Sequence, residues 1–144
     1  MTQAQTHPDL NQILDATRVI ALVGYSGNPD RPSNRVARFL KERGYRVIPV
    51  NPGLAGQDFF GEPVVASLAD IPGDAKVDML DVFRRSEAVM PVVGAALDAL
   101  PDLRTIWLQL GIRNDEARVL AAEHGLNFVE DRCPRIELER RGQP

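Results

Sequence analysis

The sequence predicts an α/β domain in which a parallel β-sheet is covered on both faces by helices. Three observations support this prediction. Short apolar runs, as at 19–23 and 45–50, alternate with amphipathic segments of about ten residues. The first apolar run leads into a turn that contains Gly24 and Gly27, and a helical pattern begins near Val36. Right-handed crossovers between parallel strands then place the intervening helices on both faces of the sheet.

The bulk composition narrows the class of protein. The chain has 144 residues, 44% of them hydrophobic, and a formal net charge of -3. This length suits a single domain, 1–144, and the apolar fraction excludes a disordered chain. The charge argues against a general nucleic-acid-binding protein, and no apolar run approaches the roughly 20 residues of a membrane helix. With a polar segment at 1–9 and one cysteine, Cys133, we expect a cytoplasmic protein without a disulfide.

The first half of the chain is expected to form four elements. They are a helix at 8–16, a strand at 18–23, a helix at 33–43 and a strand at 45–50. Leu10, Ile13 and Leu14 recur at helical spacing in the first of these helices. Gly44 follows the second helix, where a glycine commonly ends a helix. The sequence Asn51-Pro52-Gly53 ends the second strand.

The second half begins with a glycine-containing loop at 54–63. The expected elements are then a short strand at 64–65, a strand at 77–83, a helix at 87–100, a strand at 104–108, a helix at 114–123 and a strand at 126–129. Asn114 suits the N-cap of its helix, and Gly125 suits the end of it. We assign no element to the charged tail that begins at Asp131.

Ligands of open parallel sheets bind beyond the carboxyl ends of the strands. This rule selects the segments 24–35, 51–52, 83–86 and 109–112. In the first segment, Gly24 lets the backbone approach a phosphate, and Arg31 or Arg35 beside a helix N-terminus suits a pyrophosphate. Asp30 or Ser33 can cap that helix. The alternative is an ordinary turn with solvated arginines, and no G-x-G-x-x-G pattern decides between the two.

The other strand ends carry distinct chemistry. Asn51-Pro52 lacks the acidic residue with which NAD sites hold the ribose, so a plain NAD site is disfavoured, and this dipeptide can also be a simple strand-ending turn. Arg84 and Arg85 follow the next strand, and we expect one of them to face a phosphate. Gln109 and the backbone near Gly111 can hydrogen-bond a ligand that carries an amide.

The sequence offers no catalytic constellation and no metal-ligand spacing. His7 lies near the N-terminus and His124 near a helix end, and neither has a nucleophile beside it. Cys133 has no neighbouring histidine or second cysteine, so we expect a partly buried free thiol. We therefore expect neither catalytic residues nor a metal.

Several segments match a known family in the same order along the chain. They are Ala21–Ser26, Arg31–Ala37, Gly44–Pro52, Val77–Arg85, Trp107–Ile112 and Asp131–Pro134. Over about residues 14–138 the chain resembles the stand-alone CoA-binding domain proteins, which are similar to the N-terminal CoA-binding domain of the succinyl-CoA synthetase alpha subunit. The resemblance implies a Rossmann-like three-layer fold with strand order 3-2-1-4-5 and coenzyme A as the ligand.

The resemblance and the strand-end rule together give the candidate cofactor-binding residues. They are Gly24, Tyr25, Ser26, Arg31, Asn34, Arg35, Asn51, Pro52, Phe83, Arg84, Arg85, Gln109, Gly111 and Ile112. Coenzyme A carries a 3′-phosphate and a pantetheine arm, which require cationic donors and an apolar groove with a few amide partners. Tyr25 stands where the family more often has alanine, and we expect it to narrow the loop. We do not carry over the ligase chemistry, because the synthetase's phosphorylated histidine belongs to a second domain.

We expect a protein that binds coenzyme A or a short acyl-CoA at the strand ends without chemistry of its own. One alternative is a small nucleotide-dependent oxidoreductase. Another is an accessory or regulatory subunit that supplies the CoA site to an acyl-CoA enzyme. A further one is a redox sensor that forms a mixed disulfide between Cys133 and CoA. A protein partner or a homo-oligomer is compatible with the sequence, whereas nucleic acid and membrane are not expected.

Overall fold

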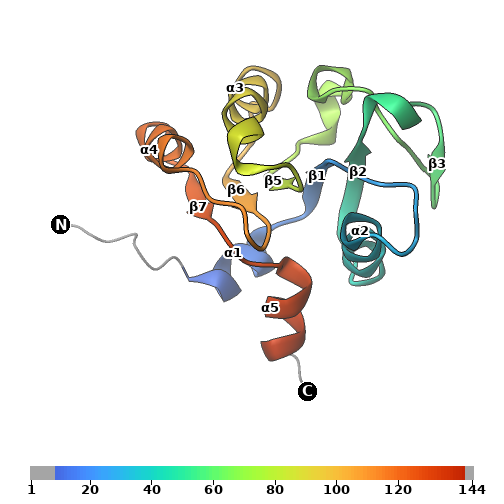
Figure 1. Cartoon of the computed structure of the whole chain (residues 1–144), viewed down its shortest axis with the longest axis horizontal. Coiled ribbons are helices and arrows are strands. Elements are labelled where there is room, and N and C mark those ends of the chain that lie inside the picture. The colour runs from blue at the N-terminus through green and yellow to red at the C-terminus, as the bar shows by residue number, and fades with distance from the viewer. Residues whose placement is uncertain (1–8, 142–144) are drawn as a thin grey trace.

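The computed structural model describes residues 9–141 and contains a parallel sheet with the strand order β2-β1-β5-β6-β7. The strands are β1 (Val19–Val23), β2 (Arg46–Val50), β5 (Met79–Val82), β6 (Thr105–Leu108) and β7 (Asn127–Val129). Figure 1 shows β2 and β7 at opposite ends of the sheet. The α/β, Rossmann-like sheet that the sequence predicts is confirmed.

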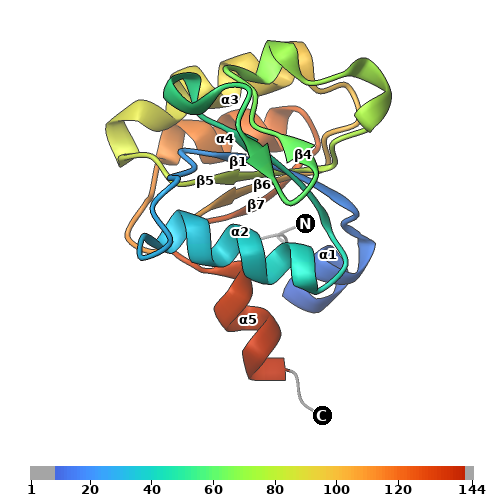
Figure 2. The same cartoon turned by 90° about the vertical axis from the view of Figure 1, so that its right-hand side faces the viewer.

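Helices cover both faces of this sheet. They are α1 (Leu10–Ala16), α2 (Pro32–Glu42), α3 (Val89–Ala99), α4 (Asp115–Glu123) and α5 (Pro134–Arg141). Figure 2 shows the sheet between α3 and α4 on one side and α1, α2 and α5 on the other. The three-layer arrangement follows from strands that are apolar on both faces, since each face must be buried. None of the helices in the described part of the chain is long and apolar enough to cross a membrane.

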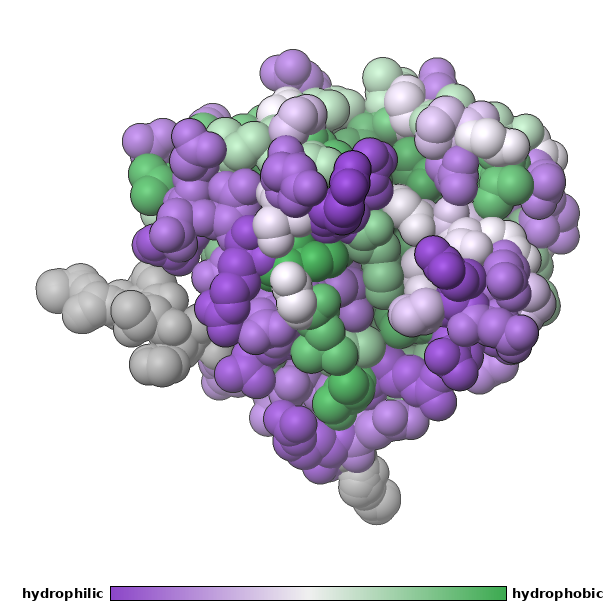
Figure 3. Space-filling view, viewed as in Figure 1, coloured by the Kyte–Doolittle hydropathy of each residue, from purple (hydrophilic) through white to green (hydrophobic). Residues whose placement is uncertain are grey.

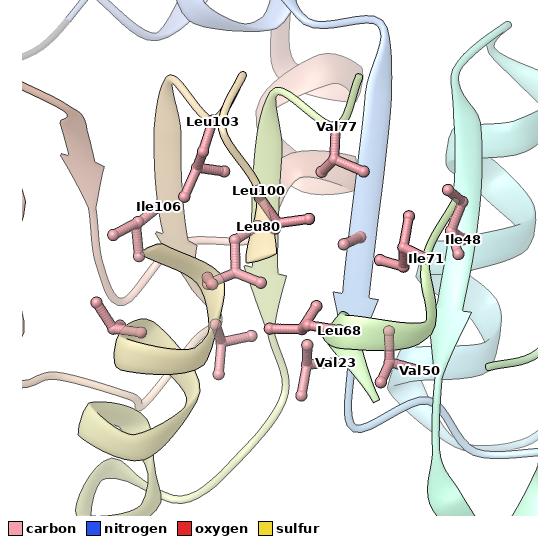
Figure 4. Close-up of a cluster of buried hydrophobic side chains, with 14 of the residues drawn as sticks. Val23, Ile48, Val50, Leu68, Ile71, Val77, Leu80, Leu100, Leu103 and Ile106 are labelled. Carbon is pink, nitrogen blue, oxygen red and sulfur yellow. The ribbon is translucent and has the colours of Figure 1, made fainter. Parts of the chain in front are cut away.

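Alternate residues of each strand enter opposite layers of the core. In β5, Leu80 and Val82 pack in the layer under α3 and α4. Figure 4 shows part of this layer, in which Leu80 lies near Ile106 of the neighbouring strand. Met79 of β5 faces the opposite layer, which also buries Trp107 and side chains from α1, α2 and α5. Asp81 alternates with Leu80 and Val82, so its carboxyl enters the same layer as Met79 and Trp107.

The predicted third strand is the main difference from the expected order. Outside β2, Val65 makes one isolated parallel bridge to Val50, and 64–65 forms no strand. Val64 does not pair with β2, because its N–H donates to Gln57 O at 2.9 Å. The preceding residues form a hairpin of β3 (Asp58–Phe59) and β4 (Glu62–Pro63). In the predicted order 3-2-1-4-5, strand 3 is the segment 64–65, which lies beside β2 but forms no strand. When the five strands of the sheet are numbered along the chain, their order is 2-1-3-4-5.

The tail contains a helix, α5, that the sequence analysis does not predict. Leu138 is buried, and the Arg135 guanidinium lies 5.1 Å from the centre of the Phe39 ring of α2. The apolar residues of α5, Ile136 and Leu138, are two positions apart, so they give no helical periodicity. The helix is stabilised by docking on its neighbours, which a local pattern does not reveal.

The cap of α4 and the glycines that end α2 and α4 agree with the sequence prediction. Asn114 caps α4, with its Oδ1 accepting from Ala117 N–H at 2.9 Å. Gly44 and Gly125 have φ angles of 103° and 68°, as expected of glycines that end helices. The helix expected at 87–100 begins with a 3₁₀ turn at Ser86–Ala88 before α3. His7 lies outside the described residues.

Candidate functional site

The carboxyl ends of β1, β2, β5 and β6 meet at one edge of the sheet, which faces the viewer in Figure 1. Backbone hydrogen bonds join the segments that follow these strands. Gly24 N–H donates to Val50 O at 3.2 Å. Phe83 N–H donates to Val23 O at 2.8 Å, and Gln109 N–H to Val82 O at 3.2 Å. The structure therefore brings the predicted site segments together along this edge.

Gly24 is the point at which the β1–α2 loop meets the end of β5. Its φ is 89°, a conformation that favours glycine. A Cβ atom at this position would lie 2.3 Å from Phe83 O and 3.2 Å from Arg84 Cδ. The absence of a side chain thus permits the close approach of two site segments.

Polar side chains of the β1–α2 loop are bound to the loop itself. Asn34 is buried, and its Nδ2 donates to Ser26 O at 2.9 Å and to the Tyr25 hydroxyl at 3.2 Å. Its Oδ1 accepts from Arg38 Nε at 2.8 Å. Ser26 N–H donates to Ser33 Oγ at 2.9 Å. These groups fix the shape of the loop, and both N–H groups of the Asn34 amide are used within the protein.

The N-terminus of α2 differs from the sequence prediction. Neither Asp30 nor Ser33 is the N-cap, because Arg31 occupies that position and makes no capping hydrogen bond. The Ser33 hydroxyl accepts from Ser26 instead, and Pro32 starts the helix. Arg31 and Arg35 are exposed beside this end. A helix N-terminus without a side-chain cap and with two arginines beside it favours an anion.

Tyr25 does not narrow the loop with its side chain. The residue is only 7% exposed, and its ring packs edge-on against Phe59 at 5.5 Å between centroids. Burial raises the pKa of its hydroxyl, with Arg38 and the Asn34 hydrogen bond acting in the opposite direction. The tyrosine therefore fills the core under the loop, and only its backbone lies along the edge.

The end of β2 is a structured turn. Asn51 Nδ2 donates to Tyr25 O at 2.6 Å, while its Oδ1 accepts from Gly53 N–H at 2.7 Å. Pro52 begins a 3₁₀ turn, Pro52–Leu54, and is exposed. The asparagine thus ties two site segments together, which matches the strand-ending role considered for this dipeptide.

The two arginines after β5 have different positions. The Arg84 stem lies near the turn at Gly24, since its Cδ would be 3.2 Å from a Cβ atom added to Gly24. Arg85 points away: its side chain is 85% exposed and meets Glu87 only at 3.7 Å. Phe83 is partly buried against the core under α2. Arg84 is therefore the arginine of this pair that borders the first loop.

Two buried polar side chains near this edge lack hydrogen-bond partners among the described residues. Gln109 is 5% exposed, and its Oε1 accepts no hydrogen bond. Asp81 is fully buried on the central strand, and neither carboxylate oxygen has a partner. Burial raises the pKa of Asp81 well above its usual range. An unsatisfied buried acceptor costs about 1–3 kcal/mol, so both groups are exceptions to ordinary core packing.

Comparison with known proteins identifies the family. The profile of the CoA binding domain matches residues 18–139. The chain belongs to the CoA-binding domain family. The uncharacterized protein YneT of Bacillus subtilis (strain 168) is 34% identical over 134 residues, which are 93% of this chain and 95% of that protein. A solved structure from Thermus thermophilus is 41% identical with a TM-score of 0.83, over 91% of this chain and 95% of the other.

The fold of this CoA-binding domain also occurs inside a larger enzyme. The structure of the dinucleotide forming acetyl-coenzyme A synthetase 1 of Ca. Korarchaeum cryptofilum matches with a TM-score of 0.62 and 22% identity. The match covers 83% of this chain and 26% of that one. At this identity the likeness concerns the fold.

The β6–α4 loop of this CoA-binding domain is held by residues that the sequence analysis did not select. Gly111 N–H donates to Asp131 Oδ1 at 2.7 Å, so this amide is occupied within the protein. Ile112 is partly buried against the core. Arg113 and Asp131 form an ion pair at 2.9 Å. Asp131 belongs to a segment that carries the family resemblance, which was the available signal, but its contact with Gly111 is between distant parts of the sequence.

Other features of the CoA-binding domain lie away from this edge. A cavity of about 300 Å³ at the carboxyl ends of α1, α2 and α5 is lined by Arg18, Arg43 and Arg141, whose charges suit helix carboxyl ends. A cavity of about 1250 Å³ follows β7 between α1 and α4. Cys133 is a free thiol and only 4% exposed. No group of metal-ligand residues occurs in 9–141.

Proposed function

We propose that this chain binds coenzyme A or a short acyl-CoA at the carboxyl edge of its sheet, without chemistry of its own. The single observation that supports this most directly is the orphaned Gln109 Oε1 in a member of the CoA-binding domain family. A buried acceptor without a donor is unfavourable, and a rotation of the Gln109 side chain toward the edge would let a ligand N–H satisfy it. The pantetheine arm carries amide N–H groups, which are donors of the required kind.

The rest of the edge fits the other parts of this ligand. The N-terminus of α2 lacks a side-chain cap and suits the pyrophosphate, with Arg31 and Arg35 beside it. Arg84, over the Gly24 turn, is placed to meet a further phosphate. In Figure 3 hydrophobic residues lie in the middle of this edge and continue downward over α5, with hydrophilic residues on either side. An apolar band between cationic groups suits an arm attached to phosphates.

The test is isothermal titration of the purified chain with coenzyme A, 3′-dephospho-CoA, acetyl-CoA and NAD. We expect the chain to bind coenzyme A, to bind 3′-dephospho-CoA more weakly, and not to bind NAD. Similar affinities for coenzyme A and acetyl-CoA would mean that the thiol end is outside the site. A preference for NAD, or no binding of any of the four, would contradict the proposal.

A second candidate is an accessory protein that supplies the CoA site to a separate acyl-CoA enzyme in the cytoplasm. The observation that favours it is the occurrence of the same fold as about a quarter of an acetyl-coenzyme A synthetase chain. Co-purification of the chain with one acyl-CoA ligase, strengthened by added coenzyme A, would support this role. Recovery of the chain alone under these conditions would argue against it.

A further inference from the structure

Asp131 has an unusual backbone conformation for its residue type. It follows β7 and has a φ of 57°, in the left-handed region that favours glycine. Such a conformation is unfavourable in a non-glycine residue and persists only where surrounding contacts impose it. Aspartate tolerates this region better than most residues, because its short side chain can bond to nearby backbone groups. The contacts that impose it here converge on the β6–α4 loop.

The Asp131 side chain holds two parts of that loop at once. Oδ1 accepts from Gly111 N–H at 2.7 Å, and Oδ2 accepts from the Arg113 guanidinium at 2.9 Å. The N–H of Asp131 itself donates to Ile112 O at 3.2 Å. The Gly111 hydrogen bond, followed by the bond and charge of Arg113, lowers the pKa of the Asp131 carboxyl, so the charged form is the one that binds the loop.

The same loop is tied to the segment after β5. Arg113 N–H donates to Ser86 Oγ at 3.1 Å, and Asn114 Nδ2 donates to Ser86 O at 3.1 Å. Asn114 N–H in turn donates to Glu130 Oε1 at 3.1 Å. Three segments are thereby joined at the carboxyl edge, two of which contain the proposed ligand residues Arg84 and Gln109.

We propose that Asp131 is a positioning residue that holds the Gln109–Ile112 turn in the shape that receives the ligand. The proposal rests on the proposed function, since it assigns a role in the same site. It explains why Asp131 adopts a strained conformation. The hydrogen bonds of Asp131 described above all go to the β6–α4 loop, which contains the unsatisfied Oε1 of Gln109. A positioning role makes a distinct prediction: removal of the carboxylate weakens ligand binding even where it relieves strain and leaves the fold as stable as before.

The test combines coenzyme A titration with chemical unfolding for three variants. Asp131→Gly relieves the φ strain and removes the carboxylate, Asp131→Ala removes the carboxylate and leaves a Cβ atom in the left-handed conformation, and Asp131→Asn keeps an acceptor for Gly111. We expect Asp131→Gly and Asp131→Ala to weaken coenzyme A binding by at least about tenfold, as the loss of one good hydrogen bond would. Asp131→Asn should restore affinity to within about threefold of the unmodified chain. The stability of Asp131→Gly should not fall.

A matched control is available in the β3–β4 hairpin. Asp58 Oδ1 accepts from Gly61 N–H at 3.0 Å, a similar bond that involves none of the proposed ligand residues. Asp58→Ala should lower stability without changing affinity. If affinity and stability fall together in Asp131→Gly, or if neither changes, the positioning role is wrong. If the unmodified chain binds no coenzyme A at all, the proposed function fails and this inference fails with it.

Discussion

The two loops at the carboxyl edge satisfy their polar groups in opposite ways. In the β1–α2 loop, the Asn34 amide and the backbone of Ser26 bond to one another and to their neighbours. At the start of the β6–α4 loop, Gln109 Oε1 is buried without a donor, although the rest of that loop is firmly held. The contrast indicates that the two loops have different roles in the site. We propose that the first loop is a rigid scaffold beside the N-terminus of α2 and its arginines, whereas the second retains an acceptor that is unsatisfied among the described residues and is available to a ligand.

The largest expected effect is a loss of stability on substitution of Gly24 in the β1–α2 loop. Gly24→Ala would place a Cβ atom 2.3 Å from Phe83 O in a backbone conformation that alanine disfavours. We expect a loss of about 4 kcal/mol in the free energy of unfolding, from steric overlap and strain together. Denaturant unfolding measures this loss. Gly27→Ala is the control, since its Cβ atom would only reach ordinary contact with Leu54 at 3.4 Å. Equal stability of the two variants would mean that the β1–α2 loop is not fixed against β5.

The next effect concerns the buried carboxyl of Asp81, which shares the core layer beneath the loops. Burial raises its folded-state pKa above the usual 3.8, so the folded chain binds the proton more tightly than the unfolded chain does. The contribution of the Asp81 proton to the free energy of unfolding is therefore fully present below pH 3.8 and is lost as the pH rises toward the folded-state pKa. Within this window the loss is about 1.4 kcal/mol per pH unit.

Asp81→Asn removes this proton and preserves the shape of the side chain. We expect the difference in unfolding free energy between the variant and the unmodified chain to grow in favour of the variant as the pH rises from 4 to 7. Unfolding curves at several pH values measure the difference, which cancels the contributions of the other titrating groups. A pH-independent difference would show that Asp81 is ionised in the folded protein.

The smallest expected effects are on coenzyme A affinity, and they differ between Arg84 and Arg85, the two arginines after β5. Arg84→Ala should weaken coenzyme A binding by about tenfold, the worth of one hydrogen bond between charged groups. Arg85→Ala should change it by less than about twofold, because an exposed side chain 3.7 Å from Glu87 contributes little. Titration at two salt concentrations checks both, since a phosphate contact weakens with added salt. The reverse order of effects would place the phosphate on the outer side of the β5–α3 turn.

Local sequence patterns were sufficient for the sheet and for the segments that form its carboxyl edge. Alternation of apolar runs with helical spacing predicted the five strands of the sheet, together with a strand at 64–65 that does not form. The strand-end rule selected Gly24, Arg84 and Gln109 without contact information. The patterns could not show that Ser33 is bound by Ser26 rather than capping α2, because that bond depends on how the loop folds back. They also could not show that Tyr25 points into the core, since its partner Phe59 comes from a distant hairpin.

The unpredicted parts share a physical cause. α5 has no amphipathic repeat and is stabilised by docking on α2, and the role proposed for Asp131 depends on a bond to Gly111, twenty residues away. Asp81 looks like an ordinary polar residue in the sequence. Gln109 is selected by the strand-end rule, but only burial reveals that its oxygen, like those of Asp81, lacks a partner among the described residues. Features that depend on long-range contacts or on desolvation were therefore missed, while features that depend on local order were found.

The most direct test of the account replaces Gln109 with methionine, which has a similar shape but no amide. Coenzyme A affinity and unfolding free energy are then measured on the same preparation. The account predicts that stability is unchanged or rises by about 1 kcal/mol, because an unsatisfied buried acceptor is removed, while affinity falls about tenfold or more. Unchanged affinity with raised stability would contradict it, since the orphaned oxygen would then have no part in binding the ligand.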